Sequence, residues 1–274
     1  MKYRIINFEK QIIRRLADLI GVTSFATEID ITRHQPSFEA EGGHIVKLDL
    51  CECKLSTFPE YLFNLRFLEW LDLTQNLIAY IPDSIVQFKY LHFLSLGSNQ
   101  LKIFPRAILK QSALHVLNLS DNQIRYIPNS INKLKELEHL ALNRNILSFL
   151  PRSISNLTKL KNLYLDDNRL RFLPRMIGNL ESLENFSLIN NLLKKIPKSI
   201  GNLHKVKFLA LSKNSLVSLP HAIGNMISLK FLWLDNNNLR KLPSSISNIK
   251  TLRKLRLDHN PLDFVPPLPD NICL

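Results

Sequence analysis

The chain has 274 residues and a formal net charge of +13 at pH 7, from 36 Lys and Arg against 23 Asp and Glu. A hydrophobic fraction of 45% and a mean hydropathy of -0.03 exclude a disordered chain and a polytopic membrane protein. Three cysteines exclude a disulfide-stapled secreted scaffold. Leucine occurs 52 times and glycine only 7 times, which argues against an enzyme built on glycine-rich phosphate loops.

Residues 1–43 are expected to form an N-terminal cap. Charged side chains interrupt every apolar run, so neither an export signal nor a membrane span is predicted. Apolar residues at helical spacing predict a helix over about residues 6–20, with Gly21 as a suitable stop. An extended pair is expected over residues 27–41, broken at Gln35-Pro36, and we interpret the whole as a cover for the first strand edge. The expected compartment is the cytoplasm, with delivery as a secreted effector left open.

A 23-residue repeat runs from about residue 45 to residue 266, in the pattern LxxLxLxxNxLxxLPxxIxxLxx. Ten of the 14 prolines keep this period. Asparagine keeps it too, and we call its position the ladder slot. The ladder slot holds Cys53, Asn76, Asn99, Asn122, Asn145, Asn168, Asn191, Asn214, Asn237 and Asn260.

Each part of the repeat has a physical reason. The L-x-L core predicts a short strand with its leucines inward, and stacked units would lay these strands out as a parallel sheet. The ladder asparagine can both donate and accept, so it can satisfy backbone groups in the turn, whereas Cys53 can do so only weakly. The Leu-Pro step fixes φ and starts the convex segment. No unit can bury its own apolar face, so each depends on its neighbours.

The repeat resembles the leucine-rich repeat family over residues 44–266, and its LPxxIxxL form is similar to the intracellular class of Ras-pathway scaffolds, erbin, Scribble and many bacterial and archaeal proteins. The resemblance implies an α/β solenoid, a horseshoe of about ten repeats with a concave parallel sheet and short helical, 3-10 or extended convex segments. It also implies a non-enzymatic signalling scaffold that binds a protein on its concave face. Residues 267–274 are expected to form a short tail or cap, with a polyproline ligand at 266–269 as the alternative.

No catalytic site, metal site or cofactor is predicted. Cys51 and Cys53 are two apart on an expected strand, so their side chains would point to opposite faces and not share an ion. A row seven positions before the ladder slot is interpreted as a charge ladder, with Glu184 between Lys161 and Lys207. The alternative, a metal site, is disfavoured because four residues in a row span about 14 Å and do not converge. The row holds Glu69, His92, His115, Glu138, Lys161, Glu184 and Lys207.

The concave face is the expected protein-binding surface, at the outward strand positions six, four, two and one before the ladder slot. These positions hold eight acidic and five basic residues together with several aromatic ones. Leucines already fill the inward positions, so the aromatic residues indicate an interface; the alternative is that they only cover neighbouring rungs. The protein-binding candidates are Trp70, Asp72, Phe93, His139, Tyr164, Asp166, Phe208, Phe231, Trp233, Asp235, Arg256 and Asp258.

The basic excess lies in columns three and seven positions after the ladder slot, along one flank and the convex shoulder. Binding of a polyanion, either nucleic acid or an anionic membrane, is the alternative function, and solubility is the plainer interpretation. A surface that binds single strands needs aromatic side chains among its basic ones, and the aromatic residues expected in these columns are only Tyr126 and Phe172. Nucleic acid is therefore disfavoured. The expected partner is an unidentified protein, and the chain is expected to be a monomer. We call these two columns the basic stripe, and its residues are Lys102, Arg106, Arg125, Arg152, Arg171, Arg175, Lys194, Lys198 and Arg240.

Overall fold

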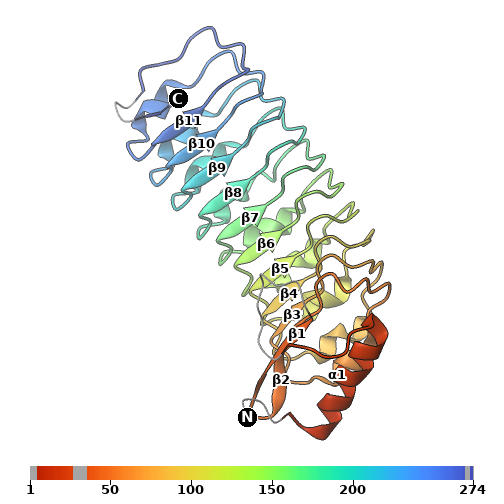
Figure 1. Cartoon of the computed structure of the whole chain (residues 1–274). Coiled ribbons are helices and arrows are strands. Elements are labelled where there is room, and N and C mark those ends of the chain that lie inside the picture. Colours follow the sequence, from red (N-terminus) through yellow and green to blue (C-terminus); the bar gives the residue numbers. More distant parts are fainter. Residues whose placement is uncertain (1–4, 27–35, 269–271, 274) are drawn as a thin grey trace. The chain divides into compact units, whose positions relative to one another are not determined.

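The structure is a computed structural model that describes residues 5–26, 36–268 and 272–273 (Figure 1). It divides into two units, residues 1–123 and residues 124–274. The first unit holds helix α1 (Asn7–Ile20) and strands β1 (Ser37–Glu41), β2 (His44–Asp49), β3 (Trp70–Asp72), β4 (Phe93–Ser95) and β5 (Val116–Asn118). The second unit holds β6 (His139–Ala141), β7 (Asn162–Tyr164), β8 (Asn185–Ser187), β9 (Phe208–Ala210), β10 (Phe231–Trp233) and β11 (Lys254–Arg256).

Neighbouring strands pair in parallel from β2 to β5 and again from β6 to β11, with each repeat position opposite the same position of the next repeat. Leu71 of β3, for example, is opposite Leu48 of β2 and Leu94 of β4, and all three are fully buried. The residues on either side of each central leucine point outward because side chains alternate along a strand. We call this outward side of the strands, the expected concave face, the strand face. The predicted solenoid with a parallel sheet is confirmed in each unit.

Short 3-10 helices follow the repeat prolines on the side away from the strand face (Figure 1). Pro151, for example, has φ -65 and is the N-cap of the helix Arg152–Asn156. Proline suits this place because its ring sets φ and its missing N–H would have no partner there. The other 3-10 helices are Glu60–Asn64, Asp83–Gln87, Arg106–Lys110, Asn129–Lys133, Ile177–Asn179, Lys198–Asn202, His221–Asn225 and Ser244–Asn248.

Glycine is required where two of these 3-10 helices approach closely. A Cβ atom built on Gly201 would lie 2.2 Å from the carbonyl oxygen of Ala222, and one on Gly178 would lie 1.9 Å from that of Ser199. No side chain fits at such distances. The repeat pattern did not reveal this role of the few glycines.

The ladder asparagines from Asn76 to Asn237 are buried and Asn260 is half-buried; they bond to the backbone of two neighbouring repeats. In Asn168, Oδ1 accepts from the Leu147 N–H at 3.0 Å, while Nδ2 donates to the carbonyls of Leu142 at 2.9 Å and Leu165 at 3.1 Å. The same set of bonds recurs at Asn76, Asn99, Asn191, Asn214, Asn237 and Asn260. Each side-chain amide thus supplies hydrogen bonds that the backbone of the turn would otherwise lack.

The strands are shorter than the repeat pattern predicted. Each of β3 to β11 has three residues, which lie six to four positions before the ladder slot. The expectation that positions two and one before the slot are strand positions was therefore wrong, and Asp166, Asp235 and Asp258 lie in the turn that follows the strand.

A left-handed residue ends the extended path of the chain three positions after the last strand residue. The residue just before each ladder slot has positive φ, for example 53 at Asp167 and 56 at Asn236. This conformation costs a non-glycine residue about 1 kcal/mol or more. It also turns the Asp167 N–H toward the Ile189 carbonyl at 2.8 Å, so hydrogen bonding between repeats continues through the turn.

Helix α1 is tied to β2 by a buried carboxylate. Glu9 is 2% exposed, and its Oε2 accepts from the Ile45 N–H at 2.7 Å while Oε1 lies 3.1 Å from His44 Nδ1. Ile12 and Leu16 are buried on the same helix. Strand β1 pairs antiparallel with the outer edge of β2 (Figure 1). Residues 27–35 of the expected extended pair lie outside the described residues.

At the other end, Cys273 pairs with β11. Its carbonyl accepts from the Leu255 N–H at 2.9 Å, and its N–H donates to the Arg253 carbonyl at 2.9 Å. These bonds engage an edge that would otherwise present unpaired groups. Pro269 of the polyproline alternative lies outside the described residues, and the domain boundaries at 43 and 266 stay predictions. No helix in the described part of the chain is both long and apolar enough to cross a bilayer.

Candidate protein-binding site

Four side chains meet on the strand face of the second unit, and we call them the aromatic cluster. Phe208 of β9 and Trp233 of β10 meet edge-on, with ring centroids 4.7 Å apart at 83°. Phe231 lies beside Phe208 at 6.5 Å. The guanidinium carbon of Arg256, on β11, is 4.4 Å from the centroid of the Trp233 ring. Edge-on rings and a cation over an indole are both favourable arrangements.

The aromatic cluster leaves apolar surface and a hydrogen-bond donor without a partner. Phe231 is 37% exposed, although it lies on a strand. The indole Nε1 of Trp233 is covered and has no acceptor among the described residues. A buried donor without an acceptor costs about 1–3 kcal/mol. The free protein therefore keeps an incompletely satisfied surface at this point.

Acidic groups lie beside the aromatic cluster. Asp235 accepts from Ser212 Oγ at 2.6 Å and from the Asn236 amide at 3.0 Å. Burial raises the pKa of Asp235, but these hydrogen bonds and the charge of Arg256 outweigh burial, so the pKa lies below its ordinary value. The surface is hollowed here by a depression lined by Asp235, Asn236, Arg256, Asp258 and His259.

Three other predicted residues of the second unit, His139, Tyr164 and Asp166, bond to other residues of their own unit. His139 Nδ1 lies 2.7 Å from Asn162 Nδ2, and the Tyr164 hydroxyl lies 3.5 Å from the Asn162 oxygen. Asp166 accepts from the Ile189 N–H at 2.7 Å. Burial raises the pKa of Asp166 despite its hydrogen bonds, and burial together with Asp166 raises the pKa of Tyr164. The ring contacts described above for the aromatic cluster involve none of these three residues.

The first unit holds the predicted Trp70, Asp72 and Phe93. The rings of Trp70 and Phe93 are stacked, with centroids 4.7 Å apart at 12°. Asp72 accepts from the Thr74 N–H at 2.7 Å, and burial raises its pKa above the ordinary value despite that bond. The stacked rings of Trp70 and Phe93 form a smaller candidate surface for binding a protein.

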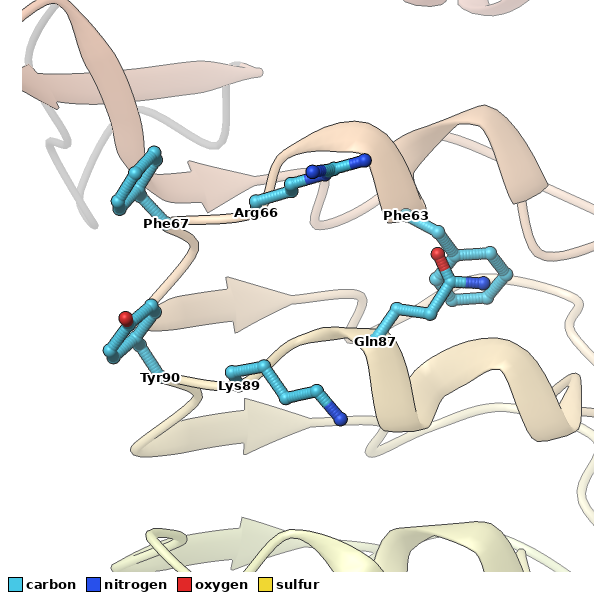
Figure 2. A pocket seen from close by; sticks show the side chains of 6 residues that line it. All are labelled: Phe63, Arg66, Phe67, Gln87, Lys89 and Tyr90. Atoms are coloured by element: carbon cyan, nitrogen blue, oxygen red, sulfur yellow. The ribbon is translucent and has the colours of Figure 1, made fainter.

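A second aromatic row in the first unit was missed by the sequence analysis. Phe67 and Tyr90, nine positions before the ladder slot, are 43% and 52% exposed, with ring centroids 6.0 Å apart at 7°. Figure 2 shows the two parallel rings at one side of a pocket, with Arg66 and Lys89 between them and the rest of its lining. Aromatic residues exactly 23 apart at one repeat position were the signal available.

The row seven positions before the ladder slot forms ion pairs. Lys161 Nζ lies 2.7 Å from Glu138 Oε2, and Lys207 Nζ lies 2.6 Å from Glu184 Oε2. The hydrogen bond from Lys207 lowers the pKa of Glu184, and the charge of Lys161 adds to this effect. The predicted placement of Glu184 between two lysines is therefore confirmed. Among the described residues, no three His, Cys, Asp or Glu side chains are grouped to hold a metal ion.

Cys51 and Cys53 do not lie on a strand as predicted, because β2 ends at Asp49 and a left-handed turn begins. Both thiols are free and half-buried. Cys51 Sγ is 3.6 Å from Gln75 Oε1, and Cys53 Sγ is 3.5 Å from the Cys51 carbonyl. Burial, with nearby carboxylates, raises the pKa of each thiol to about 12.

All nine predicted stripe residues are exposed, two in the first unit and seven in the second. The count of interleaved aromatic residues was too low. Phe149 occupies the same repeat position as Tyr126 and Phe172, and all three are exposed.

Comparison with family models decides the family. The model described as leucine-rich repeat region matches residues 105–197, and two further leucine-rich repeat models match residues 43–101 and 228–249. The chain belongs to the leucine-rich repeat family. This fold is a general protein-interaction module, and its members are typically non-enzymatic. Comparison with curated proteins gave no match.

Three solved structures illustrate the likeness. A leucine-rich repeat protein of Leptospira interrogans is 30% identical, with 81% of this chain and 67% of that one covered and a TM-score of 0.54. The ectodomain of the Arabidopsis thaliana receptor kinase GASSHO1/SCHENGEN3, in complex with CASPARIAN STRIP INTEGRITY FACTOR 2, is 28% identical over 82% of this chain, with a TM-score of 0.75. A TDR receptor is 26% identical over 79% of this chain, with a TM-score of 0.67. The chain covers only 28% and 43% of these two receptor chains.

Proposed function

We propose that this leucine-rich repeat protein is a non-enzymatic scaffold that binds a protein partner on its strand face, with the aromatic cluster of the second unit as the main contact. The single observation that carries the proposal is the cluster of Phe208, Phe231, Trp233 and Arg256 on three neighbouring strands, in which the Trp233 indole N–H has no acceptor among the described residues. Tryptophan, tyrosine and arginine are enriched at interface hot spots.

The chemistry of the surroundings describes the partner. An apolar side chain would cover Phe231, and a carbonyl or carboxylate oxygen would accept from Trp233 Nε1 once the atoms that cover this nitrogen move. Asp235 and Asp258 beside the cluster would pair with a basic group at the rim. The similar receptor ectodomain in complex with CASPARIAN STRIP INTEGRITY FACTOR 2 supports protein binding by this kind of solenoid.

We infer that this scaffold acts in signal transduction in the cytoplasm, which fits the similarity of the repeat to the intracellular class.

A matched pair of variants tests the proposed function. Phe231→Ala with Trp233→Ala removes the aromatic cluster, while Phe67→Ala with Tyr90→Ala removes two exposed rings elsewhere. Capture of proteins from the source cell by immobilised protein is compared by quantitative mass spectrometry, after circular dichroism has shown that both variants fold. A partner lost from the first variant and kept by the second supports the proposal. Equal capture by both variants contradicts it.

A further inference from the structure

We propose that the second unit carries a docking surface for an anionic lipid bilayer on its flank, away from the strand face. The surface consists of residues 146–156, 169–179 and 192–202, which we call the basic–apolar patch. These are equivalent stretches of three successive repeats, each running from just after the ladder slot to the end of a 3-10 helix.

The charge of the patch is of one sign. None of the three stretches contains an Asp or a Glu. Within the described part of the chain, no ion pair involves their basic side chains. A surface with cations that the chain itself does not neutralise attracts an anionic partner. The principal exposed cations are Arg152, Arg171, Arg175, Lys194, Lys195 and Lys198.

The patch also exposes large apolar side chains among these cations. Phe149 is 44%, Phe172 59%, Met176 56% and Leu192 44% exposed. Phe149 and Phe172 occupy the same position of neighbouring repeats, so they are spaced by one repeat. Single exposed apolar residues are common on proteins, but several in one small region indicate an interaction surface.

One depression joins the two kinds of side chain. Its lining includes Phe172, Pro174 and Met176 together with Arg152 and Arg175. Arg152, Arg175 and Lys198 share one repeat position, the first after each proline, and form a column of cations in three successive repeats. The apolar residues thus lie next to groups that can bind phosphate.

This combination fits a lipid surface better than a nucleic acid. Met176 and Leu192 cannot stack on bases as aromatic side chains do, whereas a single-strand platform depends on such stacking. Aliphatic and aromatic side chains that enter the boundary between headgroups and acyl chains, beside Lys and Arg that bind anionic headgroups, are typical of interfacial membrane surfaces. Long basic side chains can cover apolar surface while their charged ends stay in water.

The experiment is co-sedimentation of the full chain with vesicles of pure phosphatidylcholine and with vesicles that contain added phosphatidylserine, over a salt series. The triple variant Arg152→Gln, Arg175→Gln, Lys198→Gln should lower the partition coefficient about a hundred-fold, since each cation near an anionic surface contributes roughly fivefold. Phe172→Ala with Met176→Ala keeps the charge and should lower partitioning several-fold. The residues replaced in this triple variant are exposed, and so are Lys205, Lys250 and Arg253, which are replaced in the control variant below.

The control triple Lys205→Gln, Lys250→Gln, Arg253→Gln removes the same charge outside the patch and should reduce partitioning far less. Binding that needs phosphatidylserine, weakens with salt and follows this order of variants supports the proposal. Equal loss in the two triple variants, or no binding to phosphatidylserine vesicles, overturns it. Binding of single-stranded RNA that competes with vesicles and is unaffected by Phe172→Ala with Met176→Ala overturns it in favour of a nucleic-acid surface.

Discussion

The guanidinium carbon of Arg256 lies 4.4 Å from the ring centroid of Trp233, although the two residues are 23 positions apart in the sequence. They occupy the same repeat position on adjacent parallel strands, so the stacking of repeats alone brings them together. Phe208 of β9, the strand on the other side of β10, meets the same indole at an interplanar angle of 83°. A periodic fold therefore assembles a local cluster from residues that no short motif connects.

Replacement of a ladder asparagine should destabilise the protein strongly. Asn168→Ala leaves the Leu147 N–H and the Leu142 and Leu165 carbonyls without their side-chain partner. We expect a loss of about 3 kcal/mol in the free energy of unfolding, measured by urea denaturation. The exposed Asn156→Ala is the control and should change stability by less than about 0.5 kcal/mol. Similar losses in both variants would contradict the role assigned to the ladder.

Asp166 should make stability depend on pH. Burial raises its pKa in the folded protein, so its contribution is fully present below the unfolded pKa of about 3.9 and is lost as pH rises through the folded pKa. Asp166→Asn keeps an acceptor for the Ile189 N–H and should be more stable than the parent at pH 7 by less than about 1 kcal/mol, since the group is only partly buried.

The advantage of Asp166→Asn should vanish below about pH 4, where the parent aspartate is itself protonated. Thermal melts from pH 3 to pH 8 measure it. Exposed Asp263→Asn serves as the matched control. An advantage of Asp166→Asn that is constant across this range would refute the assignment.

The three thiols should differ in reactivity. Burial raises the pKa of Cys51 and Cys53 to about 12, so at pH 8 only about one thiol in ten thousand at each site is a thiolate. Cys273 is exposed. Titration with a disulfide reagent at pH 8 should show one fast thiol, and Cys273→Ser should remove that phase. Two or three fast thiols in the parent would show that Cys51 or Cys53 is not held as described.

Helix α1 should loosen when its buried carboxylate is removed. Glu9→Ala leaves the Ile45 N–H without its acceptor and breaks the contact with His44, at a cost of about 2 kcal/mol. Limited trypsin digestion should then cleave faster at Lys10. The control Glu60→Ala, at an exposed residue, should leave the rate of cleavage at Lys10 unchanged. Unchanged cleavage in Glu9→Ala would show that the helix is held by its apolar face alone.

The solenoid could be predicted from sequence because one physical pattern recurs ten times. The inward leucines, the ladder asparagines and the convex prolines each have a requirement that holds in every repeat. The cation over Trp233 and the row of Glu184 with its lysines follow from the same period, since it places equal positions side by side.

The turns after the strands depend on backbone dihedral angles, which the 23-residue sequence period does not reveal. The left-handed residue before each ladder slot is a Lys, Arg, Asp, Asn, Ser, Gln, Glu or His, with no glycine to mark it, so the turn after each strand could not be predicted. The partly buried hydrogen bonds of Asp166, which lies in this turn, could not be predicted for the same reason. The exposed rings of Phe67, Tyr90 and Phe149 lie outside the expected face, at positions where the 23-residue period repeats an aromatic residue.

The central claim is that a protein partner contacts the aromatic cluster. The most direct measurement is photo-cross-linking in the source cell, with a benzoylphenylalanine in place of Phe231 and, in a second strain, in place of Phe67, whose side chain is similarly exposed. We predict one discrete cross-linked protein from position 231 and none from position 67. The absence of a product at position 231, or the same product from both positions, would contradict the account.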